Sequence, residues 1–155
     1  MADVMIRKSG IHAKGLFAAR DFRKGEQVTH WHPRRILTKG QLRKLSVHDK
    51  NYVEYLGKGR YALMGSPENR INHSCDPNTF IRNLGDVALR DIKKGEEITS
   101  DYSVNSAASW SFGCSCKSKD CRKVVTGDFR KLEPRTKRRL RRYLAPWFRE
   151  EFLRK

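Results

Sequence analysis

Acidic side chains and long apolar segments are both scarce in this sequence. Its 155 residues include 17 Asp and Glu against 34 Lys and Arg, so the formal net charge at pH 7 is +17. No apolar stretch approaches the roughly 18–20 residues that a membrane-spanning helix needs, and the N-terminus lacks the apolar core of a secretory signal. We therefore expect an intracellular protein with no membrane partner. The positive charge predicts contact with a polyanion, above all nucleic acid.

Cysteine is limited to four residues, whereas aromatic side chains are sufficient for a buried core. Disulfides are rare in the reducing interior of a cell, where cysteines more often bind metals or act in catalysis. The 7 Phe, 5 Tyr and 3 Trp, within a hydrophobic fraction of 37%, exclude a wholly disordered basic chain.

Short strands separated by turns are expected in the first two thirds of the chain. Residues 52–56 and 61–64 are predicted strands, and the turn between them at residues 57–59 contains two glycines, which accept a positive φ. Thr38 is a suitable N-cap for a short helix. Residues 103–111 are small and polar, so we expect a loop or linker there. The pattern predicts a mostly β fold with short helices.

Two segments of the chain resemble each other. Residues 20–28 and 90–98 match almost residue for residue, and each places a Lys-Gly turn before an extended segment. Because the chain has only two copies, we interpret them as a recurring turn and not as a repeat architecture.

The end of the chain is strongly basic and has a helical pattern. Residues 130–155 contain 11 basic and 3 acidic side chains, a net charge of +8. Pro134 suits a first helical turn, and Pro146 is expected to stop or kink the helix. Leu140 and Leu144 lie one turn apart. The basic side chains could bind DNA, or they could form the solvated face of a helix that packs through its apolar residues.

Three of the four cysteines lie close together, and the fourth lies far upstream. Zinc prefers four tetrahedral ligands, and thiolates bind it well, so the clustered cysteines could share one ion with the upstream one. The candidate ligands are Cys75, Cys114, Cys116 and Cys121. Two alternatives stay open. The four thiols could be unrelated, or Cys75 could form a nucleophile pair with His73.

Four motifs occur in order along the chain. They are the glycine-containing residues 14–18, the Asn-His-Ser-Cys-Asp-Pro-Asn sequence of residues 72–78, the Gly-Glu-Glu-Ile-Thr-Ser-Asp-Tyr sequence of residues 95–102, and the Cys-x-Cys-x4-Cys run that precedes Arg122. In this order they resemble the SET-domain protein lysine methyltransferases with a post-SET zinc module, in a compact form without a cysteine-rich pre-SET region. The resemblance covers roughly residues 8–129.

The resemblance implies a SET fold of small β-sheets with a C-terminal pseudoknot. It divides the chain into a SET catalytic domain at residues 1–105, a post-SET zinc module at residues 106–129 and a basic C-terminal helical extension at residues 130–155. It implies methyl transfer from S-adenosylmethionine to lysines of a protein substrate, expected to be a histone tail or the tail of another DNA-binding protein. The expected location is then the nucleus and chromatin of a eukaryote, or the cytoplasm and nucleoid of a bacterium.

The same resemblance assigns roles to individual residues. Tyr102 corresponds to the catalytic tyrosine of the family, which orients the lysine amine. Structural zinc is implied at the four cysteines. The residues implied in binding S-adenosylmethionine are Lys14, Gly15, Leu16, Asn72, His73 and Phe112.

Two positions near these residues depart from the family pattern. Ala13 stands where the family usually has glycine, so the nucleotide pocket is expected to shift slightly. Ser100 stands two residues before Tyr102, where the family has Phe or Tyr, an aromatic residue that governs how many methyl groups are added. A small side chain leaves room for a methylated amine and favours di- or trimethylation. The alternative function is a zinc-containing nucleic-acid-binding protein without catalytic activity.

Overall fold

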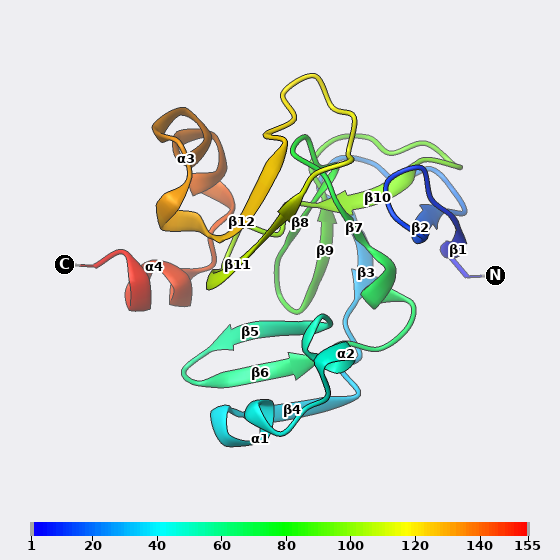
Figure 1. Cartoon of the computed structure of the whole chain (residues 1–155). Helices are drawn as coiled ribbons and strands as arrows, with labels where there is room; N and C mark the ends of the chain where they lie inside the picture. The colour runs from blue at the N-terminus through cyan, green and yellow to red at the C-terminus, as the bar shows by residue number, and fades with distance from the viewer. Residues whose placement is uncertain (1, 155) are drawn as a thin grey trace.

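Among the described residues, most of the regular secondary structure consists of short strands, which form four small sheets (Figure 1). The computed structural model describes residues 2–154. The expected mostly β fold with short helices is confirmed, since the longest helices have seven residues. Within the described residues, no helix combines the length and the apolar character that crossing a membrane requires.

The strands are β1 (Val4–Lys8), β2 (Lys14–Ala18), β3 (Gln27–His30), β4 (Arg35–Thr38), β5 (Val53–Gly57), β6 (Arg60–Leu63), β7 (Asn72–His73), β8 (Thr79–Ile81), β9 (Gly85–Ala88), β10 (Glu97–Ser100), β11 (Ala107–Gly113) and β12 (Val124–Asp128). The helical segments are α1 (Lys39–Arg43), α2 (Val47–Lys50), η1 (Glu68–Arg70), η2 (Phe129–Lys131), α3 (Pro134–Leu140), η3 (Arg141–Tyr143) and α4 (Pro146–Phe152). In spatial order, the sheets are β1-β2-β10-β7, β3-β9-β8, β4-β6-β5 and β11-β12.

The sheet β1-β2-β10-β7 brings together motifs that are far apart in the sequence. β2 pairs antiparallel with β1 and with β10, whereas β10 pairs in parallel with β7. In the parallel pair, Thr99 lies opposite Asn72 and Ser100 lies opposite His73. The Asn-His motif therefore lies beside the C-terminal end of β10, which is two residues before Tyr102. The pseudoknot that the resemblance implies stays a prediction.

The two matching segments of the sequence form turns that contact each other. Phe22 and Ile92 exchange two backbone hydrogen bonds, of 2.8 and 2.9 Å, and both side chains are buried in one apolar cluster. The aspartate of each turn, Asp21 or Asp91, accepts a hydrogen bond of 2.8 Å from a backbone N–H of the other turn. The glycines of the two Lys-Gly turns have φ values of +85° and +89°, which glycine adopts without strain. The recurring turn is thus a reciprocal contact between two distant parts of the chain.

The helix and the hairpin expected between residues 38 and 64 are confirmed. Thr38 caps α1, since its hydroxyl accepts from the backbone N–H of Gln41 while the Gln41 side chain accepts from the backbone N–H of Thr38. β5 and β6 pair antiparallel around their glycine-containing turn, with Tyr55 opposite Tyr61.

The loop expected at residues 103–111 is wrong for its second half. β11 begins at Ala107 and pairs antiparallel with β12, with Ala107 opposite Asp128 and Gly113 opposite Val124. Small polar residues favour strands only weakly. The pairing with β12 satisfies their backbone groups, and this long-range partner is not visible in the local composition.

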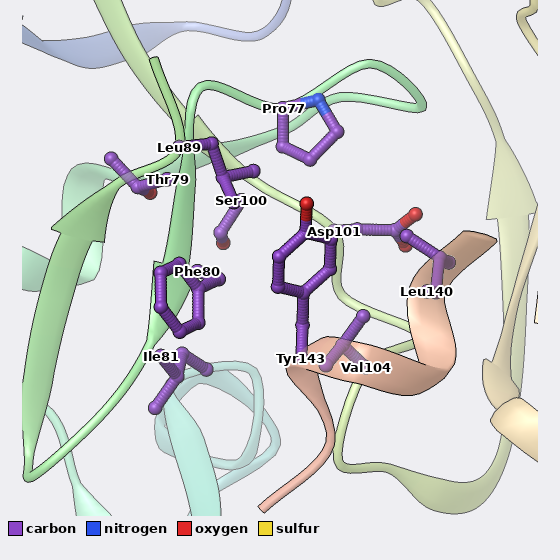
Figure 2. Close-up of a pocket in the computed structure, with 10 residues that line it drawn as sticks. All are labelled: Pro77, Thr79, Phe80, Ile81, Leu89, Ser100, Asp101, Val104, Leu140 and Tyr143. Atoms are coloured by element: carbon purple, nitrogen blue, oxygen red, sulfur yellow. The ribbon is translucent and has the colours of Figure 1, made fainter. Parts of the chain in front are cut away.

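The basic C-terminal segment folds as two short helices that pack on the sheets. The helical pattern breaks after Tyr143, and Pro146 begins α4, a position that suits proline. The buried residues of this region form one apolar cluster of Val104, Phe129, Leu132, Leu140, Leu144 and Phe148. Figure 2 shows Tyr143 pointing into a pocket beside Phe80 of β8, and the two ring centroids are 5.2 Å apart. The segment therefore packs through its apolar residues.

Asp86 is a buried acid in the sheet β3-β9-β8. It is only 1% exposed, and its Oδ2 accepts hydrogen bonds from the Thr29 hydroxyl at 2.7 Å and the Trp31 ring N–H at 2.8 Å. Burial raises the pKa of Asp86 to about 6, although the two hydrogen bonds lower it. At neutral pH, the ionised carboxylate therefore lowers the free energy of unfolding.

The substitution Asp86→Asn keeps an acceptor for Thr29 and Trp31 and removes the charge. Because the pKa of Asp86 is about 6 in the folded state and 3.8 ordinarily, the cost of ionisation is fully present above about pH 6 and is relieved as the pH falls towards 3.8. This cost is at most about 3 kcal/mol. In thermal unfolding followed by circular dichroism, the melting temperature of the variant should therefore exceed that of the native chain by more at pH 8 than at pH 5. An equal gain at both pH values, or a pH-dependent gain in the exposed control Asp76→Asn, would contradict this account.

Candidate active site and metal centre

Asn72 is the centre of a polar cluster. The cluster joins three of the residues that are predicted to bind S-adenosylmethionine, the methyl donor. Its Nδ2 donates to Glu97 Oε1 at 2.7 Å, to the Ser9 hydroxyl at 3.1 Å and to the carbonyl of Lys14 at 3.3 Å. The absence of a side chain at Gly15 makes room for this arrangement, because a Cβ there would overlap the carboxyl of Glu97 and crowd Asn72. Lys14, Gly15 and Asn72 therefore meet at one place. Sequence reasoning missed Ser9 and Glu97, although Glu97 lies inside a recognised motif.

The neighbours of Gly15 take different roles in the structure. Leu16 is fully buried in the core and pairs through its backbone with Ile98, so its side chain is unavailable to a ligand and a backbone contact with the donor stays a prediction. Ala13 has a φ of +39°, on the positive side that glycine tolerates best. The turn thus keeps a glycine-like shape although this chain has alanine, at a cost of about 1 kcal/mol.

Tyr102 and His73 are held together by the backbone. The N–H of Tyr102 donates to Nδ1 of His73 at 3.2 Å, and the Tyr102 hydroxyl donates to the carbonyl of Ile71 at 2.6 Å. Burial raises the pKa of Tyr102 well above its usual value, and nearby acidic groups such as Glu54 raise it further. Tyr102 is therefore a neutral hydrogen-bond donor at physiological pH and not a base.

His73 is neutral and has a defined tautomer. Burial lowers its pKa to about 4, while Asp101 raises this pKa and Arg122 lowers it. The Tyr102 N–H is 3.2 Å from Nδ1, closer than the Arg122 Nη2 donor is to Nε2 at 3.4 Å, so we assign the ring proton to Nε2. Nε2 also lies 3.4 Å from Cys75 Sγ. A ring nitrogen that already carries its proton is a donor to the sulfur and cannot deprotonate it. The geometry therefore disfavours a Cys75–His73 nucleophile pair.

Phe112 on β11 lies near the same two residues. Its ring centroid is 6.0 Å from that of His73 and 6.2 Å from that of Tyr102. Trp110, which sequence reasoning missed, stacks on Phe112 at 5.7 Å with an interplanar angle of 22°. Both aromatic residues are more than one third exposed. They form an apolar surface above His73 that is suitable for a planar ligand.

The four cysteines form one cluster. All four Sγ atoms lie within 4.8 Å of one another, and those of Cys75 and Cys114 are 3.8 Å apart. A tetrahedral zinc ion with Zn–S distances of about 2.3 Å separates its sulfurs by about 3.8 Å. The backbone N–H of Cys75 also points to Cys116 Sγ at 3.5 Å, a contact that favours a thiolate. The sulfur set therefore fits zinc, and its close spacing argues against four unrelated thiols.

Arg122 connects this sulfur cluster to the segment that carries Tyr102. Its backbone N–H donates to Cys75 Sγ at 3.4 Å, and its Nη2 donates to Asp101 Oδ1 at 2.7 Å. The Asp101 side chain is 1% exposed, so the ion pair is almost completely buried. Sequence reasoning missed this link, because nothing in the local pattern says which acid an arginine will meet.

Comparison with known proteins identifies the family. The SET domain model matches residues 13–103, which include β2, the Asn-His motif and Tyr102. The chain belongs to the SET-domain family. The recognition from the four sequence motifs is confirmed.

Curated relatives of this SET-domain chain include proteins of Plasmodium falciparum, humans and Arabidopsis thaliana. The Plasmodium falciparum "Variant-silencing SET domain-containing protein" is 34% identical over 141 residues, 77% of this chain. The human "Histone-lysine N-methyltransferase 2B" is 32% identical over 145 residues, 79% of this chain. The Arabidopsis thaliana "Histone H3-lysine(4) N-trimethyltransferase ATX1" is 34% identical over 142 residues, 76% of this chain. The aligned regions span only 5%, 5% and 13% of the lengths of these three relatives.

The cysteine cluster makes a testable prediction about metal content. We expect about one zinc ion per chain by atomic emission spectrometry, and we expect Cys116→Ser to lose most of it. Removal of the metal by a chelator should lower the melting temperature by about 10 °C, because structural zinc contributes folding free energy and 1 kcal/mol corresponds to about 2–4 °C. The neighbouring substitution Ser115→Ala is the control and should keep the metal. A native chain that is free of zinc after expression in zinc-supplemented medium would contradict the prediction.

Proposed function

We propose that this chain is an S-adenosylmethionine-dependent protein-lysine N-methyltransferase that acts on the tails of histones or other DNA-binding proteins. The contact that carries the proposal is the hydrogen bond of 3.2 Å between the Tyr102 N–H and His73. It joins the predicted catalytic tyrosine to the predicted donor-binding Asn-His pair in a chain of the SET-domain family. Two of the relatives are named as histone-lysine methyltransferases, which supports the substrate class.

The polar and aromatic residues around His73 suit the methyl donor. S-adenosylmethionine supplies a methyl group on a positively charged sulfur. The exposed aromatic faces of Phe112 and Trp110 are suitable for stacking on its adenine ring. Backbone groups near Gly15 and the side chain of Asn72 can hydrogen-bond its polar parts, since a glycine allows close approach of the backbone. In this assignment, the six donor-binding residues and the zinc ligands named above keep their predicted roles.

Tyr102 is suited to orient the substrate amine. A lysine attacks through its neutral amine, whereas free lysine has a pKa of about 10.4. A desolvated channel and a nearby cationic sulfur both favour the neutral amine. Because Tyr102 stays protonated, its hydroxyl and the adjacent carbonyl of Ile71 can position the reacting groups without taking the proton. Positioning of this kind supplies most of the rate when no covalent intermediate is formed.

The variant Tyr102→Phe tests this assignment. Loss of the hydroxyl should lower kcat for methylation of recombinant histones by about 100-fold or more, measured by mass spectrometry of the products. Binding of S-adenosylmethionine, measured by calorimetry, should change by less than about threefold, because the phenol orients the amine and not the donor. Tyr61→Phe, a half-buried tyrosine on β6, is the matched control and should keep full activity. Absence of donor binding to the native chain would overturn the proposed function.

The outer face of α3 and η3 supports DNA as a second partner. Arg135, Arg138, Arg141 and Arg142 are exposed, and none of them forms an ion pair within residues 2–154. The inner face is buried in the apolar cluster around Leu140, so a folded frame holds the four cations. Guanidinium groups recognise phosphates well, and a methyltransferase of histones works close to DNA.

A charge-reversal experiment tests the DNA contact. The triple variant Arg135→Glu, Arg138→Glu and Arg142→Glu should bind duplex DNA at least about tenfold more weakly, and its salt dependence should be less steep by about 3 in log–log slope. The matched control reverses Lys39, Arg43 and Lys44 around α1, at the opposite end of the molecule (Figure 1). Fluorescence anisotropy at several salt concentrations measures both variants. An equal loss of DNA affinity in the two variants would contradict a specific DNA-binding surface on α3 and η3.

A further inference from the structure

The C-terminal helix α4 lies beside the β5–β6 hairpin and is joined to it by hydrogen bonds and ring packing (Figure 1). Glu151 in α4 accepts from the Tyr55 hydroxyl through one carboxylate oxygen and from the backbone N–H of Lys58 through the other, each at 2.6 Å. The Trp147 ring packs against Gly57, where a Cβ would come within 2.8 Å of it. The same ring meets Tyr55 edge to face, with centroids 5.1 Å apart. The helix therefore contacts both β5 and the turn that follows it.

The same helix is anchored to the segment that follows Tyr102. Phe148 in α4 is completely buried in the apolar cluster that also contains Val104. The backbone N–H of Ala145, directly before α4, donates to Asn105 Oδ1 at 2.7 Å. Both Val104 and Asn105 lie within three residues of Tyr102. The helix α4 therefore connects the β5–β6 hairpin to the segment that carries the predicted catalytic tyrosine.

The opposite face of β5 borders the surroundings of Tyr102. Side chains alternate between the two faces of a strand, so Glu54 points away from the face that contacts α4. Burial raises the pKa of Tyr102, and the charges of Glu54 and Tyr52 raise it further, so both groups lie near the tyrosine. The Arg70 guanidinium lies over the Tyr52 ring, 5.9 Å from its centroid, and the next residue, Ile71, accepts the hydrogen bond from the Tyr102 hydroxyl. The strand β5 therefore lies between α4 and the surroundings of Tyr102.

We propose that Trp147 and Glu151 are positioning residues, which hold β5 beside Tyr102 from the far side of the hairpin and so fix the geometry in which the substrate lysine meets the tyrosine. The proposal rests on the proposed methyltransferase function. Where catalysis works by positioning, a small displacement of a supporting element lowers the rate by a large factor. The predicted donor-binding residues lie on other elements, β2, β7 and β11. Loss of the support should therefore impair use of the lysine substrate and leave binding of the donor unchanged.

Initial rates on recombinant histones, measured by mass spectrometry, test the two residues. Trp147→Ala should lower kcat/KM at least about tenfold, and Glu151→Ala about three- to tenfold, because its hydrogen bonds are exposed to water. The Kd of S-adenosylmethionine, measured by calorimetry, should change by less than about threefold. Trp147→Phe keeps a ring against Gly57 and should recover most of the rate. Glu150→Ala is the matched control and should keep the native kcat/KM, since this exposed acid of the same helix is paired with Arg154, at 3.9 Å.

Two further measurements show whether Glu151 acts through the hairpin. The backbone N–H of Lys58 should exchange with deuterium faster in Glu151→Ala and at the native rate in Glu150→Ala, and thermal unfolding shows whether each variant is folded. Adding Tyr55→Phe to Glu151→Ala should lower kcat/KM by less than Tyr55→Phe does in the native chain, because the two side chains share one hydrogen bond.

Two outcomes would overturn the proposal. One is an unchanged kcat/KM in a folded Glu151→Ala chain whose Lys58 N–H exchanges faster, and the other is unchanged exchange at Lys58. If Trp147→Ala unfolds, Glu151→Ala alone decides between these outcomes and the expected one, since its side chain is exposed. A native chain that binds the donor but methylates no histone would contradict the proposed function, and that result is distinct from an unchanged kcat/KM.

Discussion

The parallel pairing of β7 with β10 is the constraint on which the rest of the site depends. It consists of only two residue pairs, Thr99 with Asn72 and Ser100 with His73, extended by a hydrogen bond of 3.0 Å from the Ser74 N–H to the Ser100 carbonyl. It places the His73 ring next to the backbone N–H of Tyr102. It also directs the chain beyond Ser74 towards the sulfur cluster. A slip of one residue in this register would move every one of these side chains to the other face of the sheet.

The buried ion pair between Arg122 and Asp101 connects the cysteine cluster to the segment that carries Tyr102. Two charges that are removed from water are costly unless they are paired and hydrogen-bonded, and these two are 2.7 Å apart with Asp101 almost fully buried. Arg122 follows Cys121 directly, and its backbone N–H contacts Cys75 Sγ. A displacement of the sulfur cluster would therefore leave the Asp101 charge unpaired beside Tyr102. Under the proposed function, this ion pair connects the predicted zinc site to a catalytic site that works by positioning.

Local chemistry predicted the parts of this structure that depend on neighbours in the sequence. The cap at Thr38 and the glycine turn between β5 and β6 follow from rules for single residues, and the four cysteines were grouped by the chemistry of zinc ligands. Glu97 was missed as the partner of Asn72, because a carboxylate in a polar motif does not reveal which side chain it will face. The strand β11 was missed because its partner β12 lies beyond the cysteine cluster. Packing over long sequence distances decides such features, and composition does not record it.

Side chains of the C-terminal extension have three different roles, because the helix points them in three different directions. In α3, Leu140 points into the apolar cluster, Arg139 reaches the carbonyl of Cys75, and Arg135 and Arg138 are turned towards solvent. Successive helical residues are rotated by about 100°, so inserting one residue between α3 and η3 would turn Tyr143 away from its pocket. The length of this segment is therefore as constrained as its sequence. The composition of this segment suggests a simple basic tail. In the structure, however, the segment packs against residues next to Tyr102 in the sequence.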